Sequence, residues 1–251
     1  MSSTTLFTSY DPFARIYNES WAPDVCQKAL PPLEKLLFPH LLAGAKILDL
    51  CCGSGQVTQQ LLNKGYQVTG IDGSDEMLSY ARINASGAKF ILDDARFFKL
   101  PATFDAVVSM GALNYVMTLE ELAGVFRNAY AALLENGWFM FNMFLEEEYQ
   151  SAWNGGMSGD VKDDYAWAVQ QSYNPENKIG QLNITIFHLV EGTWQRKDTT
   201  ILEKCYSSAE VQSALESVGF TEVCVYDAER DLGVKRATGD AYFVCRKPLT
   251  R

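Results

Sequence analysis

A strand, a glycine turn, a helix and a second strand follow one another between residues 46 and 72, and this stretch constrains the fold more than any other part of the 251-residue chain. Residues 46–52 are apolar and few, which is typical of a buried parallel strand. Gly53 and Gly55 then allow a tight turn and a close approach of the backbone to a ligand. After a helical segment, the second strand ends on the carboxylate of Asp72. This order predicts an α/β fold with a doubly wound parallel sheet, in which the helix N-terminus and the acid bind a ribose-bearing cofactor.

The residues after the turn decide which cofactor fits. The dinucleotide-binding fingerprint has a third glycine that lets the helix pack on the strand, and Thr58 stands at that position here. The turn is also not followed by the basic residue with which a P-loop binds a triphosphate. A reductase that binds a nicotinamide cofactor is therefore a disfavoured alternative, and the chain has no Tyr-x-x-x-Lys pair to serve it.

The turn instead resembles the first two motifs of class I S-adenosylmethionine (SAM) methyltransferases. Leu-Asp-Leu-Cys-Cys-Gly-Ser-Gly at 48–55 matches the first motif, and Gly-Ile-Asp at 70–72 matches the acidic end of the second strand. Cys51 departs from the family pattern, which has glycine there, and is expected to narrow the pocket beside the methionine moiety. The resemblance implies a seven-stranded, mostly parallel, Rossmann-like sheet and SAM as the cofactor. The contacts that it implies for the cofactor come from Asp49, Gly53, Ser54, Gly55, Asp72 and Gly73.

Two further stretches resemble the parts of these enzymes that bind the adenine ring. Met77 lies one turn into the next helix, at a position that packs against adenine in the family, and a core methionine is the alternative. The third strand runs into Asp93, Asp94 and Ala95. The resemblance implies that Asp94 accepts a hydrogen bond from the adenine amine and that the backbone at Ala95 reads the ring edge, with Asp93 as the rival for the first role.

The N-terminal segment 10–21 has aromatic residues at roughly helical spacing, among them Tyr10 and Tyr17. It resembles the N-terminal lid of small-molecule methyltransferases, whose tyrosines close over the cofactor and the acceptor. Asn18 stands where that lid usually has aspartate. The alternative is an amphipathic helix that lies on the surface.

A loop at 111–115 leaves the carboxyl end of the fourth strand, 104–110, where doubly wound sheets bind their ligands. Met110 is therefore expected to border the cofactor. The loop resembles the Asp-Ser-Leu-Asn-Tyr loop of small-molecule methyltransferases, with Gly-Ala in place of Asp-Ser. Asn114 and Tyr115 are retained, and we expect them to orient the acceptor, with a loop-stabilising Asn114 as the alternative.

Residues 146–206 interrupt the alternation of strands and helices. Glycine pairs near 155–159 indicate loops, and the alternating pattern at 179–190 predicts an antiparallel insertion of about three strands that covers the acceptor. His188 falls on the apolar face of this pattern, as a buried histidine or else as a substrate contact or general base. A helix and a closing strand pair after residue 207 are expected to complete the main sheet.

The composition bounds the partners. A net charge of −10 argues against nucleic acid and favours a neutral or cationic small acceptor. Six cysteines without a C-x-x-C pair and only two histidines predict no metal site and a reducing, cytoplasmic location. The absence of a long apolar run predicts a soluble chain that does not span a membrane. The oligomeric state stays open.

These observations predict four regions: a helical lid at 1–45, a SAM-binding core at 46–145, an antiparallel cap at 146–206 and a C-terminal helix with a strand pair at 207–251. The function that we expect is SAM-dependent methyl transfer to a small molecule of secondary metabolism, with nitrogen slightly preferred over oxygen as the accepting atom. Such a nitrogen, arriving neutral, would need no base. A SAM-binding protein without activity is the remaining alternative.

Overall fold

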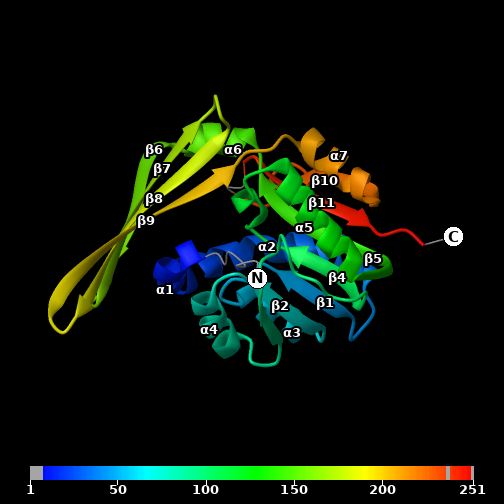
Figure 1. Ribbon diagram of the computed structural model, residues 1–251, viewed down its shortest axis with the longest axis horizontal. Coiled ribbons are helices and arrows are strands. Elements are labelled where there is room, and N and C mark those ends of the chain that lie inside the picture. Colours follow the sequence, from blue (N-terminus) through cyan, green and yellow to red (C-terminus); the bar gives the residue numbers. More distant parts are fainter. Residues whose placement is uncertain (1–7, 236–237, 250–251) are drawn as a thin grey trace, which may run out of the picture.

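Two β-sheets organise the computed structural model, which describes residues 8–235 and 238–249. The larger sheet has seven strands in the order β10-β11-β5-β4-β1-β2-β3 (Figure 1). Its strands are β1 (Lys46–Leu50), β2 (Gln67–Asp72), β3 (Lys89–Leu92), β4 (Phe104–Ser109), β5 (Leu133–Phe144), β10 (Thr221–Asp227) and β11 (Asp240–Arg246). Strands β1 to β5 are parallel, whereas β11 is antiparallel to both β5 and β10. The predicted doubly wound sheet with a closing strand pair is confirmed.

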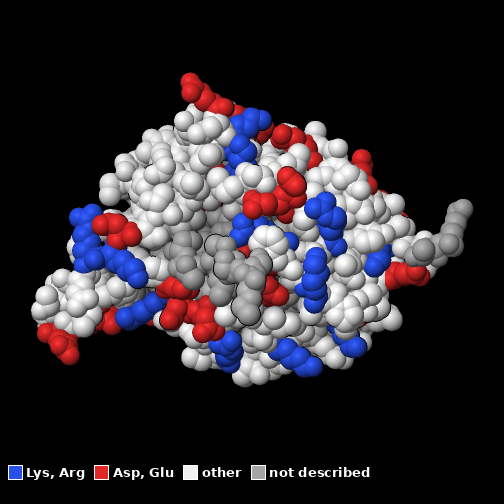
Figure 2. Space-filling view, in the orientation of Figure 1, with Lys and Arg blue, Asp and Glu red and all other residues white. Residues whose placement is uncertain are grey.

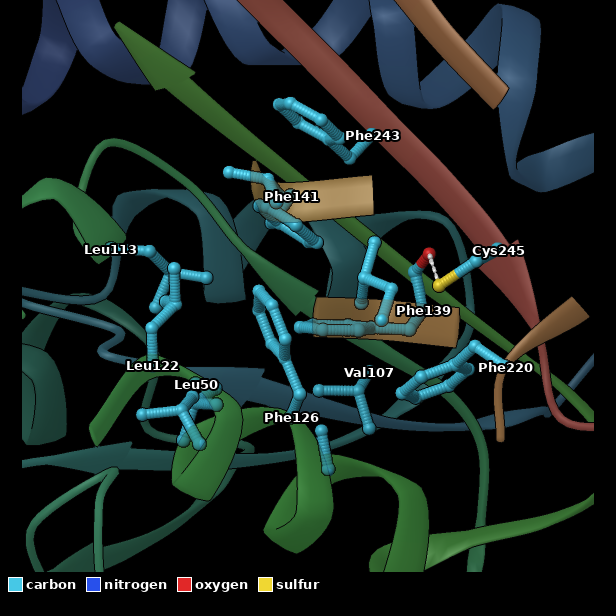
Figure 3. Close-up of a cluster of buried hydrophobic side chains, with 14 of the residues drawn as sticks. Leu50, Val107, Leu113, Leu122, Phe126, Phe139, Phe141, Phe220, Phe243 and Cys245 are labelled. Atoms are coloured by element: carbon cyan, nitrogen blue, oxygen red, sulfur yellow. Dashed lines mark hydrogen bonds between the residues drawn. The ribbon is translucent and has the colours of Figure 1, made fainter. Parts of the chain in front are cut away.

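Helices cover both faces of this sheet, which accounts for its nearly continuous apolar strands. Helices α2 (Ala22–Leu36) and α3 (Gln56–Asn63) contribute to the core on one face, and α5 (Leu119–Ala132) and α7 (Ser208–Val218) to the core on the other. Figure 3 shows the second core, in which Phe126 of α5 packs on β5. The ring centroid of Phe126 lies 5.9 Å from that of Phe139 and 5.4 Å from that of Phe141.

The order of the strands places a ligand site beside β1. The chain moves from β1 outward to β2 and β3, and then returns to the other side of β1 to form β4. The connections after β1 and β4 therefore leave in opposite directions, and a crevice opens at their carboxyl ends. Helix α4 (Asp75–Asn84) and the short 3₁₀ helix η4 (Leu113–Tyr115) begin close to this crevice.

The insertion forms a second sheet of four antiparallel strands, in the order β6-β7-β8-β9, preceded by helix α6 (Glu146–Ala152). Its strands are β6 (Asn154–Val161), β7 (Tyr165–Asn174), β8 (Ile179–Val190) and β9 (Thr193–Lys204), and the β8–β9 hairpin reaches farthest from the main sheet (Figure 1). The expectation of about three strands was wrong, because the glycine-rich segment taken for loops is an edge strand. A Cβ on Gly159 would lie only 2.5 Å from the Trp167 carbonyl oxygen, so glycine permits the close pairing of β6 with β7.

Two helices have boundaries that a nearby glycine or proline does not suggest. Helix α5 ends at Ala132 and does not continue to Asn136 before Gly137, because Leu133 is extended (ψ 141°) and pairs with Phe104. Near the N-terminus, α2 begins at Ala22 and contains Pro31, although prolines often mark the start of a helix.

The N-terminal segment and the insertion share one hydrophobic core. Segment η1 (Thr8–Phe13), α1 (Ala14–Ile16) and η2 (Tyr17–Trp21) precede α2. Phe13 and Ile16 are fully buried, and they belong to a cluster with side chains of the second sheet, such as Trp167 and Ile184. The segment is therefore not a helix laid on the surface. In the parts of the chain that the structure describes, no helix is long and apolar enough to cross a membrane.

Candidate active site

A cavity that is partly open to solvent lies at the carboxyl ends of β1, β2 and β4. This is the crevice that the strand order creates. The residues that the sequence predicts for the site and that line this cavity are Tyr10, Tyr17, Gly53, Asp72, Gly73, Met77, Asp94, Ala95, Met110 and Tyr115. Segments far apart in the sequence thus meet around one space.

Asp72 ends β2 with its carboxyl at the cavity wall. Its Oδ2 accepts a hydrogen bond from the Gly53 N–H (2.8 Å), and its Oδ1 accepts one from the Ser74 N–H (3.0 Å). The two bonds fix the carboxyl between the glycine turn and the start of α4. Burial raises the pKa of Asp72 to about 6, although these hydrogen bonds favour its charged form. A carboxyl in this place can accept hydrogen bonds from the hydroxyls of a ribose.

The glycine turn lies too close to the N-terminal segment to carry a side chain. Gly53 has a φ of 53°, and a Cβ there would lie 3.0 Å from the Tyr17 ring. Cys51 has a φ of 59°, a left-handed conformation that favours glycine, which accounts for the glycine of the family pattern. Its side chain lines the cavity. Gly55 does not line the cavity; a Cβ there would meet the Cα of Ala81 at 3.0 Å, so this glycine lets α3 and α4 pack.

Asp49 lies beneath the turn and not on the main cavity. It lines a smaller neighbouring pocket that shares Tyr17, Cys51 and Met110 with the main cavity. Its carboxyl is buried and accepts a hydrogen bond from the Thr58 hydroxyl (2.5 Å), and burial raises its pKa to about 7. The hydroxyl that this carboxyl needs explains why threonine occupies the place of the third glycine.

Asn18 ties the N-terminal segment to the glycine turn. Its Oδ1 accepts hydrogen bonds from Gln56 Nε2 (2.8 Å) and Asn84 Nδ2 (2.7 Å). The amide of Asn84 also donates to the Ser54 carbonyl (2.8 Å), so Ser54 supports the turn and does not line the cavity. The junction requires an acceptor oxygen, which asparagine supplies as well as the aspartate of the resembled lids.

The end of the cavity beside β3 holds Asp94 and Arg96. The Asp94 carboxyl is 1% exposed and accepts hydrogen bonds from the Arg96 backbone N–H (2.9 Å) and from its guanidinium (2.6 Å). A second arm of that guanidinium donates to Glu121 (2.9 Å). Asp93 does not line the cavity, and its carboxyl accepts from the Asp94 N–H, so the geometry favours Asp94 over its rival. Sequence reasoning missed Arg96, although it stands two residues after Asp94.

The loop after β4 forms the opposite end of the cavity. Gly111, Ala112, Tyr115 and Val116 line it. The Gly111 N–H donates to Asn142 Oδ1 (2.8 Å), which fixes the loop on β5. With glycine and alanine in the first two places, Tyr115 is the loop residue that brings a polar side chain to this end.

Asn114 does not point into the cavity, which corrects the expectation that it orients the acceptor. Its amide N–H groups donate to the carbonyls of Phe144 (3.1 Å) and Lys204 (3.0 Å), and its Oδ1 accepts from the Phe144 N–H (2.9 Å). The hydrogen-bonding groups of the amide are therefore occupied by the backbone at the end of β5 and at the end of β9. The alternative role, stabilisation of the loop, matches this geometry.

His188 also lies outside the cavity, so the expectation of a contact with the acceptor needs correction. It lies near the end of β8, where the strand has left the core, and its side chain is partly exposed. Arg15 and Asp164 are its charged neighbours, and burial together with Arg15 lowers its pKa. The alternation of β8 assigns a face to His188 but does not show where the strand leaves the core.

Sequence reasoning missed a buried carboxyl near Tyr115. Glu203 of β9 is 3% exposed, and its Oε2 accepts a hydrogen bond from the Tyr149 hydroxyl (2.8 Å). The Tyr115 hydroxyl also interacts with this carboxyl, and burial raises the pKa of Glu203 to about 7. The signal was present in the sequence, because alternation places Glu203 on the same face of the strand as the buried Ile201.

The residues present fit SAM. Asp72 would hold the ribose hydroxyls, Asp94 and Ala95 the adenine edge, and the backbone at Gly53 the remainder of the molecule, whose sulfonium supplies the methyl group. The Tyr10 hydroxyl is buried at the cavity without a partner of good hydrogen-bond geometry, so it is free to meet a bound molecule. Among the described residues no group of His, Cys, Asp and Glu is arranged to hold a metal ion.

Comparison with known proteins gives matches of one kind. Residues 47–137 match the family model described as "Methyltransferase domain". The "Putative methyltransferase YqeM" of Bacillus subtilis is 28% identical over 84% of this chain and 86% of its own. A "Ubiquinone biosynthesis O-methyltransferase" of Xanthomonas campestris is 31% identical, over 53% of this chain and 59% of its own.

Solved structures share the fold at lower identity. A SAM-dependent methyltransferase from Clostridium acetobutylicum superposes with a TM-score of 0.77 at 20% identity, covering 96% of this chain and 99% of that one. The sugar N-methyltransferase KedS8 from Streptoalloteichus gives a TM-score of 0.73 at 18% identity, covering 96% and 93%. The site and these matches agree: the chain has the fold of class I SAM-dependent methyltransferases, and its residues 47–137 match a methyltransferase domain.

Proposed function

We propose that this enzyme transfers the methyl group of SAM to a small molecule and that the accepting atom is an amine nitrogen. The observation that carries the proposal is the charge of the cavity wall. Among the described residues, Arg96 is the only cationic side chain that lines the cavity, and Asp94 and Glu121 pair with it at the end beside β3. The opposite end presents the phenols of Tyr10 and Tyr115.

An amine acceptor complements this wall, because it is a cation near neutral pH. Phenol oxygens can accept hydrogen bonds from an ammonium group, and the buried carboxyl of Glu203 lies behind one of them. The net charge of −10 attracts cations over longer distances. Acidic and basic side chains are interspersed on the face seen in Figure 2, which does not favour a nucleic acid as substrate. A sugar N-methyltransferase shares the fold, and relatives named for O-methylation match 53% and 96% of the chain, so the charge of the cavity wall is what favours an amine.

We further propose that the enzyme works in a reducing compartment such as the cytoplasm. All six cysteines are free thiols in the structure, and four of them are buried. Buried thiols without a disulfide partner are typical of proteins from such compartments.

The test is methyl transfer from isotopically labelled SAM to matched pairs of acceptors. The pairs are 2-phenylethylamine with 2-phenylethanol and D-glucosamine with D-glucose, and 4-ethylphenol serves as an acidic oxygen acceptor. Mass spectrometry of the products locates the label. We expect N-methyl products from the amines and none from the matched alcohols.

Two results would contradict the proposal. Methylation of 4-ethylphenol or of an alcohol in preference to its amine partner would show that oxygen is the accepting atom. Label found only on protein or nucleic acid, added in the same assay, would exclude a small molecule as the acceptor.

A further inference from the structure

A buried carboxyl lies behind the acceptor end of the cavity and does not belong to the cofactor site. Glu203 is on β9, which starts at the far end of the hairpin and returns to the main sheet (Figure 1). There the Tyr149 hydroxyl donates to its Oε2 (2.8 Å). Asn114 donates to the carbonyl of the next residue, Lys204 (3.0 Å), which brings the loop and its Tyr115 hydroxyl beside the same carboxyl. Because Tyr115 also lines the cavity, its hydroxyl connects Glu203 with the space for the acceptor.

The groups that face Glu203 leave its negative charge without a counterion. Tyr115 comes from η4, Tyr10 from η1, and Tyr149 and Glu148 come from α6. Among the described residues no lysine or arginine pairs with this carboxyl. Burial and the second acid both disfavour the ionised form, so the carboxyl holds a proton more strongly than an exposed glutamate does.

We propose that Glu203 receives, through the hydroxyl of Tyr115, the proton that the acceptor must lose to become a nucleophile. The proposal rests on the proposed function, since it requires an acceptor whose attacking atom arrives protonated. Glu203 would be a positioning and proton-receiving residue that acts through Tyr115, and Tyr115 would be the catalytic residue that touches the acceptor. This replaces the expectation of a reaction without a base.

The step balances for an amine that enters as ammonium. One N–H proton moves to the Tyr115 oxygen while the hydroxyl proton of Tyr115 moves to the Glu203 carboxylate. The freed lone pair on nitrogen then forms the bond to the methyl carbon, and the electron pair of the carbon–sulfur bond remains on sulfur. Glu203 returns its proton to solvent after the products leave. No oxidant, reductant or metal is required.

A purely structural Glu203 is the rival explanation, because the bond to Tyr149 also fastens α6 to β9. The two roles differ in whether the pKa of Glu203 changes when Tyr115, on the cavity side, is replaced. A proton relay couples the titration of Glu203 to Tyr115, whereas a structural bond depends on Tyr149 alone.

The first experiment reads Glu203 directly and needs no acceptor. Protein labelled with ¹³C at the glutamate side-chain carboxyl is saturated with S-adenosylhomocysteine and titrated by NMR, and Glu203→Gln assigns the resonance. We expect a midpoint near pH 7 that rises by about one unit in Tyr115→Phe, since a donor to the carboxylate is lost. A midpoint below pH 5, or one that Tyr115→Phe leaves unchanged, would overturn the proposal.

The second experiment measures how the rate with 2-phenylethylamine depends on pH. We expect Glu203→Gln to lower kcat about 100-fold near pH 7, with the affinity for SAM unchanged. The deficit should shrink as the pH approaches the pKa of the amine, because the nucleophile then forms without help. Tyr149→Phe, which keeps the relay but removes the other donor, should retain a rate within several-fold of the wild type and shift the inflection upward. A pH-independent loss in Glu203→Gln would indicate a structural role only.

The two experiments separate the proposals. A wild-type enzyme that methylates oxygen only, or none of the five probes, would contradict the proposed amine acceptor. The NMR titration would still decide whether Glu203 and Tyr115 share a proton.

Discussion

Replacement of Asn114 by alanine tests whether this residue is structural or orients the acceptor. The variant loses three hydrogen bonds, two donated to the carbonyls of Phe144 and Lys204 and one accepted from the Phe144 N–H. Asn114 is 5% exposed, so water does not readily replace the lost partners. A net contribution of roughly 0.5–1.5 kcal/mol for each of the three hydrogen bonds gives a loss of about 1.5–4.5 kcal/mol in the free energy of unfolding. That is a large part of the roughly 5–15 kcal/mol typical of a domain.

Urea unfolding at pH 7 measures this loss, and hydrogen exchange locates it. Because the three bonds join β5 to β9, we expect faster exchange throughout the second sheet. Asn128→Ala is the matched control, since Asn128 is equally buried but bonds Lys99 and the Ala95 carbonyl, far from that sheet. It should lower stability without changing exchange in β6 to β9. A variant Asn114→Ala with wild-type stability and a rate reduced about 100-fold would refute this reasoning and restore the role in orienting the acceptor.

Three further predictions concern the cofactor side and the buried acids. Thr58→Val keeps the shape of the side chain but removes the hydroxyl that donates to the buried Asp49 carboxyl. It should cost about 1.5–3 kcal/mol in urea unfolding, and a cost below about 0.5 kcal/mol would show that the bond is unimportant. Burial raises the folded-state pKa of Asp49, Glu203 and Asp240 to about 7. The unfolded chain loses these protons near pH 4 and the folded protein only near pH 7, so stability falls as the pH rises from about 4 to 7. Thermal melts should show this fall, by about 3 kcal/mol or more at roughly 1.4 kcal/mol per pKa unit, and a stability that increases over this range would contradict it. Asn18→Ala removes the oxygen that accepts hydrogen bonds from the amides of Gln56 and Asn84, and it should weaken SAM binding about tenfold in calorimetry. Asn18→Asp keeps an acceptor oxygen and should bind SAM as the wild type does. Equal binding by both variants would exclude a role in SAM binding for these hydrogen bonds.

The part of the site that could be predicted from the sequence is the part built by neighbours in the chain. The strand, the turn around Gly53 and the carboxylate of Asp72 lie within one short stretch, so their spacing alone predicts how they meet. The four-strand insertion was harder, because the glycines of β6 look like loop residues until a partner strand is known.

The acceptor side depends on contacts between distant segments, and there the expectations for Asn114 and His188 did not match the geometry, although Tyr115 lines the cavity as predicted. Asn114 bonds to residues 30 and 90 positions away, and nothing in its own loop reveals them. Glu203 is buried beside Tyr149 and Tyr115, which come from two other elements. The alternation of its strand can indicate the face on which it lies but not these neighbours. The expectation for His188 did not hold because a strand can continue beyond the core while its alternation of side chains stays intact.

We infer that the carboxyl of Asp72 holds the ribose of SAM. Calorimetry with SAM and with NADH, on the wild type and on Asp72→Ala, tests it most directly. Two charge-assisted hydrogen bonds are worth about 1.5–3 kcal/mol each, so the variant should bind SAM at least tenfold more weakly. Asp75→Ala is the control, because that carboxyl is exposed on α4 and should not affect binding. We predict SAM binding by the wild type and by the control, weak binding by Asp72→Ala, and no binding of NADH; tight binding of NADH with none of SAM would contradict the account.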